Sequence, residues 1–247
     1  MSDFVKSLNF DRVFHSQKPV VRMADYLIEV VSATRRSRDD FWTHAALGCS
    51  LKRFSQDPRI TCHIEYENRC GLPEIYNRAI HSDTPADMLV FIHDDVWLED
   101  LFWIERVAEA CHRYDVVGLA GNTSRGPMQP AWCFVWGAHE GVFQLDDPHH
   151  LSGSIAHGKE RGGSITKLGA AGVACELIDG VFIAARKAAL LNRNVAFDPR
   201  FKFHFYDLDF CREVRLKGMT IGTWPISVTH QSEGAFGSAV WWQGYRD

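Results

Sequence analysis

The sequence predicts an α/β protein with a mostly parallel sheet flanked by helices. Apolar, β-prone stretches alternate with amphipathic stretches over the first 120 residues, which is the pattern of strand–helix units. The stretch 89–92 is continuously apolar, as expected for a strand that is buried on both faces. A chain of 247 residues can form one large domain or two small ones. Because it has no internal repeat and no low-complexity linker, we expect a single domain.

The elements of the first half are bounded by clear signals. Asp39 or Asp40 is placed to cap a helix. Asp57-Pro58 ends that helix, and Pro73 suits the first turn of the next one. The predicted strands are 26–34, 59–66, 89–92 and 115–121, and the predicted helices between them are 41–54, 74–81 and 99–114.

The second half has a weaker pattern. Residues 122–174 are rich in Gly, Ser, His and Pro, and so long an irregular stretch in a compact domain is more often functional than idle. Gly218 is a natural stop for a helix. The predicted elements that follow are a strand over 177–185, helices over 186–192 and 207–217, and short strands over 219–224 and 228–230.

The composition excludes several classes of protein. The formal net charge is −4, which argues against a nucleic-acid binder. The seven cysteines show no paired spacing, so we expect reduced thiols in a cytoplasmic protein. We expect no signal peptide and no transmembrane segment, because the apolar runs are short. A peripheral position at a membrane surface stays open.

An acidic pair, Asp94-Asp95, follows the buried strand 89–92 directly. In open α/β sheets, ligands collect at the carboxyl ends of the strands. Two carboxylates there can hold a hard divalent cation, which in turn can hold phosphates. By the two-residue alternation of a strand, His93 shares a face with Asp95, so it is either a further ligand, a donor contact or a satisfied core histidine.

A second acidic cluster lies more than a hundred residues later. Asp207 and Asp209 open a predicted helix, where Asp is also a routine capping choice. A carboxylate in a transfer enzyme can instead take the proton from an attacking hydroxyl.

Several motifs together resemble the nucleotide-sugar glycosyltransferases of the GT-A fold, and in particular glycosyltransferase family 2. The stretch 91–96 is similar to the strand end that carries the family's DxD motif, and 179–186 to its acceptor-side strand. The resemblance spans about residues 26–235. The remaining matching positions are Asn68, Gly71, Asn77-Arg78, 197–201, 206–212, Lys217-Gly218 and His230.

The resemblance implies a Rossmann-like GT-A domain over 1–247, with a nucleotide-sugar-binding half (about 26–121) and an acceptor half (about 122–235). It implies a donor such as a UDP-sugar, a Mn²⁺ or Mg²⁺ ion, and a glycan, lipid-linked or protein acceptor. Asp207 then becomes the general base of an inverting transfer. The implied metal-site residues are Asp95, His230 and His93, and the implied donor contacts are Thr34, Arg35, Glu65, Glu67, Asn68, Arg78 and Asp94.

Two positions depart from the family's pattern. His93 stands at the first acidic position of DxD, and Tyr206 stands where the family has a Glu before its catalytic Asp. These departures keep open a catalytically silent sugar- or nucleotide-binding protein of the same fold. A nucleotidyltransferase is a further alternative, although the basic stretch 34–38 lacks the glycines of a phosphate-binding loop.

Overall fold

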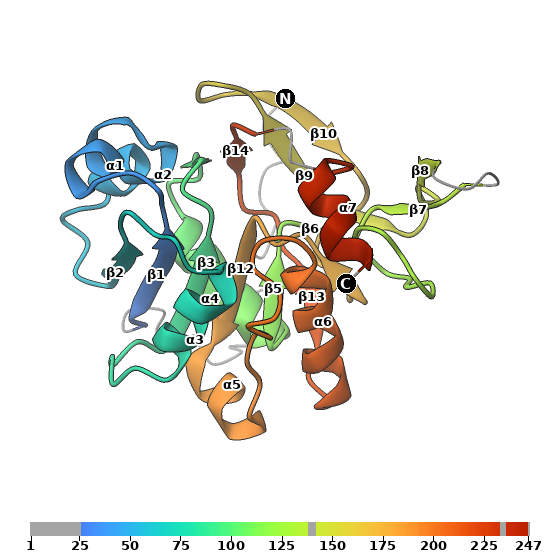
Figure 1. Cartoon of the computed structure of the whole chain (residues 1–247). Coiled ribbons are helices and arrows are strands. Elements are labelled where there is room, and N and C mark those ends of the chain that lie inside the picture. Colours follow the sequence, from blue (N-terminus) through green and yellow to red (C-terminus); the bar gives the residue numbers. More distant parts are fainter. Residues whose placement is uncertain (1–25, 138–141, 233–235, 247) are drawn as a thin grey trace, which may run out of the picture.

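The computed structural model describes residues 26–137, 142–232 and 236–246, so the single domain predicted over 1–247 extends beyond the described residues. A six-stranded sheet with the order β13-β5-β12-β3-β1-β2 forms its centre (Figure 1). The strands are β1 Ile28–Ala33, β2 Ile60–Glu65, β3 Met88–Ile92, β5 Val116–Gly118, β12 Phe182–Arg186 and β13 Ile221–Thr223.

The predicted α/β class is confirmed, but the sheet is mixed rather than mostly parallel. β1 pairs in parallel with β2 and β3, and β5 pairs in parallel with β13. β12 is antiparallel to both of its neighbours, β3 and β5. It enters the sheet at the edge where β3 ends, so it must run back along β3.

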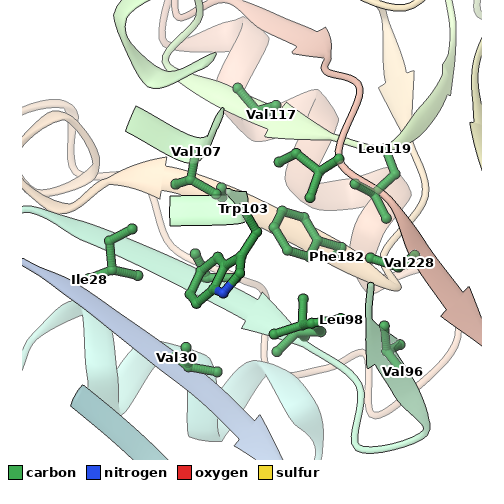
Figure 2. Close-up of a cluster of buried hydrophobic side chains, with 14 of the residues drawn as sticks. Ile28, Val30, Val96, Leu98, Trp103, Val107, Val117, Leu119, Phe182 and Val228 are labelled. Carbon is green, nitrogen blue, oxygen red and sulfur yellow. The ribbon is translucent and has the colours of Figure 1, made fainter. Parts of the chain in front are cut away.

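Helices cover both faces of this sheet, as the alternation of side chains in its strands requires. Met88, Val90 and Ile92 face one core cluster, and Leu89 and Phe91 face the other. Figure 2 shows the first cluster. Its helices are α1 Arg38–His44, α2 Ala46–Lys52 and α4 Trp103–Arg113; those of the second cluster are α3 Leu72–Ile80, α5 Lys187–Arg193 and α6 Tyr206–Leu216.

The predicted single helix over 41–54 is two helices, because Ala45 between α1 and α2 has an extended backbone. A last helix, α7, spans Ala239–Arg246. In the described part of the chain, no helix has both the length and the apolar character needed to cross a membrane.

A second sheet contains much of the weakly patterned stretch 122–174. Its order is β11-β6-β9-β14-β4, with β10 paired to β9, and a separate hairpin is formed by β7 and β8. The bounds are β4 Val96–Leu98, β6 Ala120–Asn122, β9 Leu151–His157, β10 Ser164–Lys167, β11 Leu177–Ile178, β14 Val228–His230, β7 Phe134–Trp136 and β8 Phe143–Leu145.

The chain crosses between the two sheets at a common seam. It passes from β3 to β4 through residues 93–95, from β5 to β6 through Leu119, and from β11 to β12 through residues 179–181. The predicted strands 115–121 and 177–185 are therefore each divided between the two sheets. The acidic pair Asp94-Asp95 lies in the first of these crossings, whereas Asp207 and Asp209 belong to α6.

Candidate active site

Three potential metal ligands meet at the seam. His93 and Asp95 belong to the turn between β3 and β4, and His230 ends β14, which runs antiparallel to β4 and pairs His230 with Val96. One ligand atom from each of the three side chains lies within 4.8 Å of the others. The fold thus brings together the three residues that the sequence predicts for the metal, although their role as ligands stays a prediction.

The chemistry of this cluster fits a divalent cation. Oδ1 of Asp95 is buried and accepts no well-formed hydrogen bond from any described residue, although Nε2 of His230 lies 3.3 Å away. Burial opposes ionisation of Asp95, but His230, His93 and a backbone hydrogen bond together outweigh it and lower the pKa of this carboxyl group. Two imidazoles and one carboxylate suit Mn²⁺ better than Mg²⁺, which prefers oxygen ligands.

Tyr206 determines which nitrogen of His93 carries a proton. The Tyr206 hydroxyl donates its one hydrogen to the carbonyl oxygen of Gly180, at 2.8 Å. The same hydroxyl lies 2.9 Å from Nε2 of His93, so in that second bond it accepts and the imidazole donates. His93 is therefore held as the Nε2–H tautomer, and its Nδ1 lone pair remains available to a cation.

Asp207 faces the same cavity as the three metal-ligand candidates. The cavity has a volume of about 400 Å³. The backbone N–H of Gly180 donates to Oδ2 of Asp207 at 3.2 Å, and that of Leu208 donates to Oδ1 at 3.0 Å. Burial, followed by the charge of Asp179, raises the pKa of Asp207 to about 7. A carboxyl group with such a pKa can accept a proton at neutral pH.

Asp209, the other carboxylate of the second acidic cluster, does not line this cavity. Its carboxylate lies 3.7 Å from Arg212, one helical turn along α6. The structure therefore separates the two carboxylates of the second acidic cluster.

The predicted donor contacts gather at the ends of β1 and β2. Thr34 donates from its backbone N–H to the carbonyl oxygen of Glu65 at 2.9 Å and from its hydroxyl to Asp94 at 2.5 Å. The backbone N–H of Asn68 donates to the carbonyl oxygen of Thr34 at 2.8 Å, and Arg78 lies 3.5 Å from Glu65.

Arg35 and Glu67 are exposed beside this group. None of the predicted donor contacts lines the 400 Å³ cavity, so this group and the cavity are adjacent rather than one pocket. Their connection is Asp94, which is next to His93 and Asp95 in the chain. A role in donor binding stays a prediction for all seven residues.

Sequence reasoning gave no role to three further residues at the site. Asp179 lines the cavity, and its charge contributes to the raised pKa of Asp207. A carboxylate inside the otherwise apolar stretch 177–185 was a usable signal for it. Tyr206 appears in the sequence only as a departure from a motif. His157 pairs with His230 between β9 and β14, with ring centroids 5.7 Å apart, and no local pattern predicts this pairing.

Among the solved structures that are similar to this chain are three that have low sequence identity to it. The catalytic domain of Drosophila β1,4-galactosyltransferase 7, in complex with xylobiose, is 10% identical with a TM-score of 0.45; the match covers 81% of this chain and 65% of that one. A197 from STIV is 12% identical with a TM-score of 0.41, and the match covers 84% of this chain and 86% of that one. S. aureus TarS 1–349 is 12% identical with a TM-score of 0.43, and the match covers 83% of this chain and 60% of that one. This chain thus spans less than two thirds of the galactosyltransferase and TarS chains.

No curated protein matches the sequence. A family model does: the model described as "Glycosyltransferase like family" matches residues 64–234, which include the metal-ligand candidates, Asp179 and Asp207. The match covers well over half of the chain. The protein therefore belongs to this glycosyltransferase-like family.

Proposed function

We propose that this protein transfers a glycosyl group from a nucleoside-diphosphate sugar, a UDP-sugar first among the candidates, to a hydroxyl group of an acceptor. The observation that supports this function best is that three potential metal ligands and a carboxyl group of raised pKa line one cavity. Membership of a glycosyltransferase-like family supports the same reaction class.

The charge of the site supports a requirement for metal. No lysine or arginine lines the cavity in the described part of the chain. His93, Asp95 and His230 would hold the cation, and when bound it would neutralise charge that develops on the leaving nucleoside diphosphate. The nitrogen-rich ligand set favours Mn²⁺ for this role.

The role of Asp207 follows from its surroundings. Its carboxylate takes the proton of the acceptor hydroxyl as the oxygen forms its bond to the anomeric carbon. The bond from that carbon to the diphosphate breaks, and its electron pair leaves with the phosphate oxygen. Attack from the face opposite the leaving group inverts the anomeric centre. Two backbone amides hold the carboxylate in place for this step.

In this proposal residues 26–121 bind the nucleotide and residues 122–235 form the acceptor side of a single domain. The ends of β1 and β2 then contact the nucleotide, through residues that include Thr34, Glu65 and Asn68. We also propose a cytoplasmic location, free or peripheral at a membrane; all seven cysteines are free thiols, as expected in a reducing compartment.

A turnover assay tests the proposal. The protein is incubated with MnCl₂, a panel of nucleoside-diphosphate sugars and a mixture of acceptor glycosides, and the release of nucleoside diphosphate is measured. Release that depends on Asp207 supports glycosyl transfer. Formation of pyrophosphate from a nucleoside triphosphate and a sugar phosphate would instead identify a nucleotidyltransferase. Tight nucleotide binding without any turnover would identify a silent binding protein.

A further inference from the structure

The wall of the cavity beyond its ionisable residues is largely aromatic. Phe203 is 50% exposed and stacks on the ring of His93, with centroids 5.7 Å apart and an interplanar angle of 29°. The ring of His204 also lies beside Phe203, with centroids 5.2 Å apart and an interplanar angle of 80°, and the exposed half of Phe203 lines the cavity. The aromatic residues of the wall are Trp132, Phe134, Phe203, Phe205, Phe236 and Trp241.

Contacts between separate segments hold this wall in shape. Phe134 of β7 stacks on Phe236, with centroids 4.7 Å apart and an interplanar angle of 15°. Trp241 of α7 lies 4.8 Å from Phe236 and 5.3 Å from Phe205 between ring centroids. Figure 1 shows α7 between the β7–β8 hairpin and β9, above α6. Packed aromatic rings lose little entropy when a ligand binds, so the wall is preorganised.

The charge of the cavity limits what the wall can bind. The carboxylates that line it are Asp95, Asp179 and Asp207, and no lysine or arginine among its described lining residues balances them. A phosphate or carboxylate group on the acceptor would approach these carboxylates without a positive side chain to pair with. The volume of 400 Å³ lies at the low end of small-ligand pockets, about 300–1,000 Å³, and so suits a sugar unit better than a folded protein surface.

We infer that the acceptor is an uncharged saccharide whose ring lies with a C–H face against the aromatic wall at Phe203 and presents a hydroxyl to Asp207. This inference rests on the proposed function and selects the glycan among the glycan, lipid-linked and protein acceptors. An aromatic face supplies apolar contact area to the C–H side of a sugar ring, while the hydroxyls at its edge remain free for hydrogen bonds.

Saturation-transfer NMR on the metal-free protein tests the inference. The probes are methyl glycosides of neutral hexopyranoses, with glucose 6-phosphate and glucuronate as anionic counterparts. We expect transfer to the C–H protons of one ring face of a neutral glycoside and weaker binding of both anions. Phe203→Ala and Phe134→Leu should each weaken binding by about threefold to tenfold, the value of one aromatic contact. Phe102→Ala is the matched control, because Phe102 is 64% exposed and lies outside the cavity lining.

Preferred binding of the anions, no binding of any neutral glycoside, or binding that neither wall variant weakens would overturn the inference. Calorimetry of UDP and GDP with MnCl₂ is run on the same samples. If a nucleotide binds and no neutral glycoside does, the acceptor class is wrong while the proposed function stands. If no nucleotide binds, the proposed function fails whatever the glycosides do.

Discussion

Removal of the Tyr206 hydroxyl should weaken metal binding, although Tyr206 itself is not a ligand. Tyr206 is 3% exposed, and its hydroxyl both accepts from His93 at 2.9 Å and donates to Gly180 at 2.8 Å. Tyr206→Phe leaves both partners unpaired, and a buried unpaired polar group costs about 1–3 kcal/mol. His93 can relieve this by changing its tautomer or its orientation, and both changes move the Nδ1 lone pair away from the cation.

The expected loss is about 10–100-fold in Mn²⁺ affinity, or about 1.4–2.7 kcal/mol, as for other residues that orient a metal ligand. The affinity is measured by calorimetry or by the electron paramagnetic resonance signal of free Mn²⁺. Nitrogen-15 NMR of the imidazole reports the tautomer directly. In His93→Ala, adding Tyr206→Phe should cause no further loss, because the two residues act as a unit.

The chain offers a matched control in Tyr76→Phe. Tyr76 is fully buried, its ring centroid is 6.0 Å from that of Tyr206, and its hydroxyl interacts with the Tyr206 hydroxyl without forming a well-formed hydrogen bond to His93 or to any other described residue. This variant should bind Mn²⁺ as the wild type does. If Tyr206→Phe binds Mn²⁺ within twofold of the wild type, or if Tyr76→Phe loses as much affinity as Tyr206→Phe, Tyr206 does not orient His93.

The other predictions concern the base and the cation. Asp207→Asn should lower kcat by about 10²–10⁴-fold with donor affinity nearly intact, because an amide cannot accept the proton; more than about a tenth of the wild-type kcat would assign the base elsewhere. Transfer should rise with pH through about 7, where Asp207 ionises, and a flat rate between pH 6 and pH 8 would contradict this role. The raised pKa also means that the folded state binds this proton more tightly than the unfolded chain, so stability should fall as pH rises from about 4 to about 7. Asp207→Asn should therefore unfold at a higher urea concentration than the wild type at pH 8, and an unchanged midpoint would contradict the shift. EDTA should abolish binding of the nucleoside diphosphate in calorimetry, and Mn²⁺ should restore it better than Mg²⁺; undiminished affinity in EDTA would exclude the metal site.

The regular part of the fold is predictable because its signals are local. The strands β1, β2 and β3 and the helices between them follow from apolar runs, a proline at the first turn of α3 and the periodicity of side chains. The seam is different. Leu119 and Gly180 lie inside apolar stretches that read as continuous strands, and only pairing with distant strands makes the chain leave one sheet for the other there. The strands within residues 122–174 could not be predicted for the same reason, since β9 is defined by its pairing with β6, β10 and β14.

The candidate site likewise has a part that the sequence predicts and a part that depends on contacts between distant residues. The order of the motifs brings His93, Asp95, His230 and Asp207 into consideration, and the fold places them around one cavity. The bond between His93 and Tyr206 joins residues 113 positions apart, so no spacing rule indicates it. Each residue alone is a departure from a motif, whereas in the fold the two are hydrogen-bond partners.

The reversed direction of β12 has a consequence for how two carboxylates can share the site. The segment that enters β12 presents consecutive amide groups: Gly180 donates to Asp207 at 3.2 Å, and Val181 donates to Asp179 at 3.1 Å. Each acidic side chain thus has its own dipole to moderate their mutual repulsion. A strand that ended here would present its last carbonyl oxygens instead, and their negative ends would repel both anions. Reversing one strand therefore lets the protein keep the buried Asp207 next to a second negative charge, and burial, followed by that charge, raises the pKa of Asp207 to about 7.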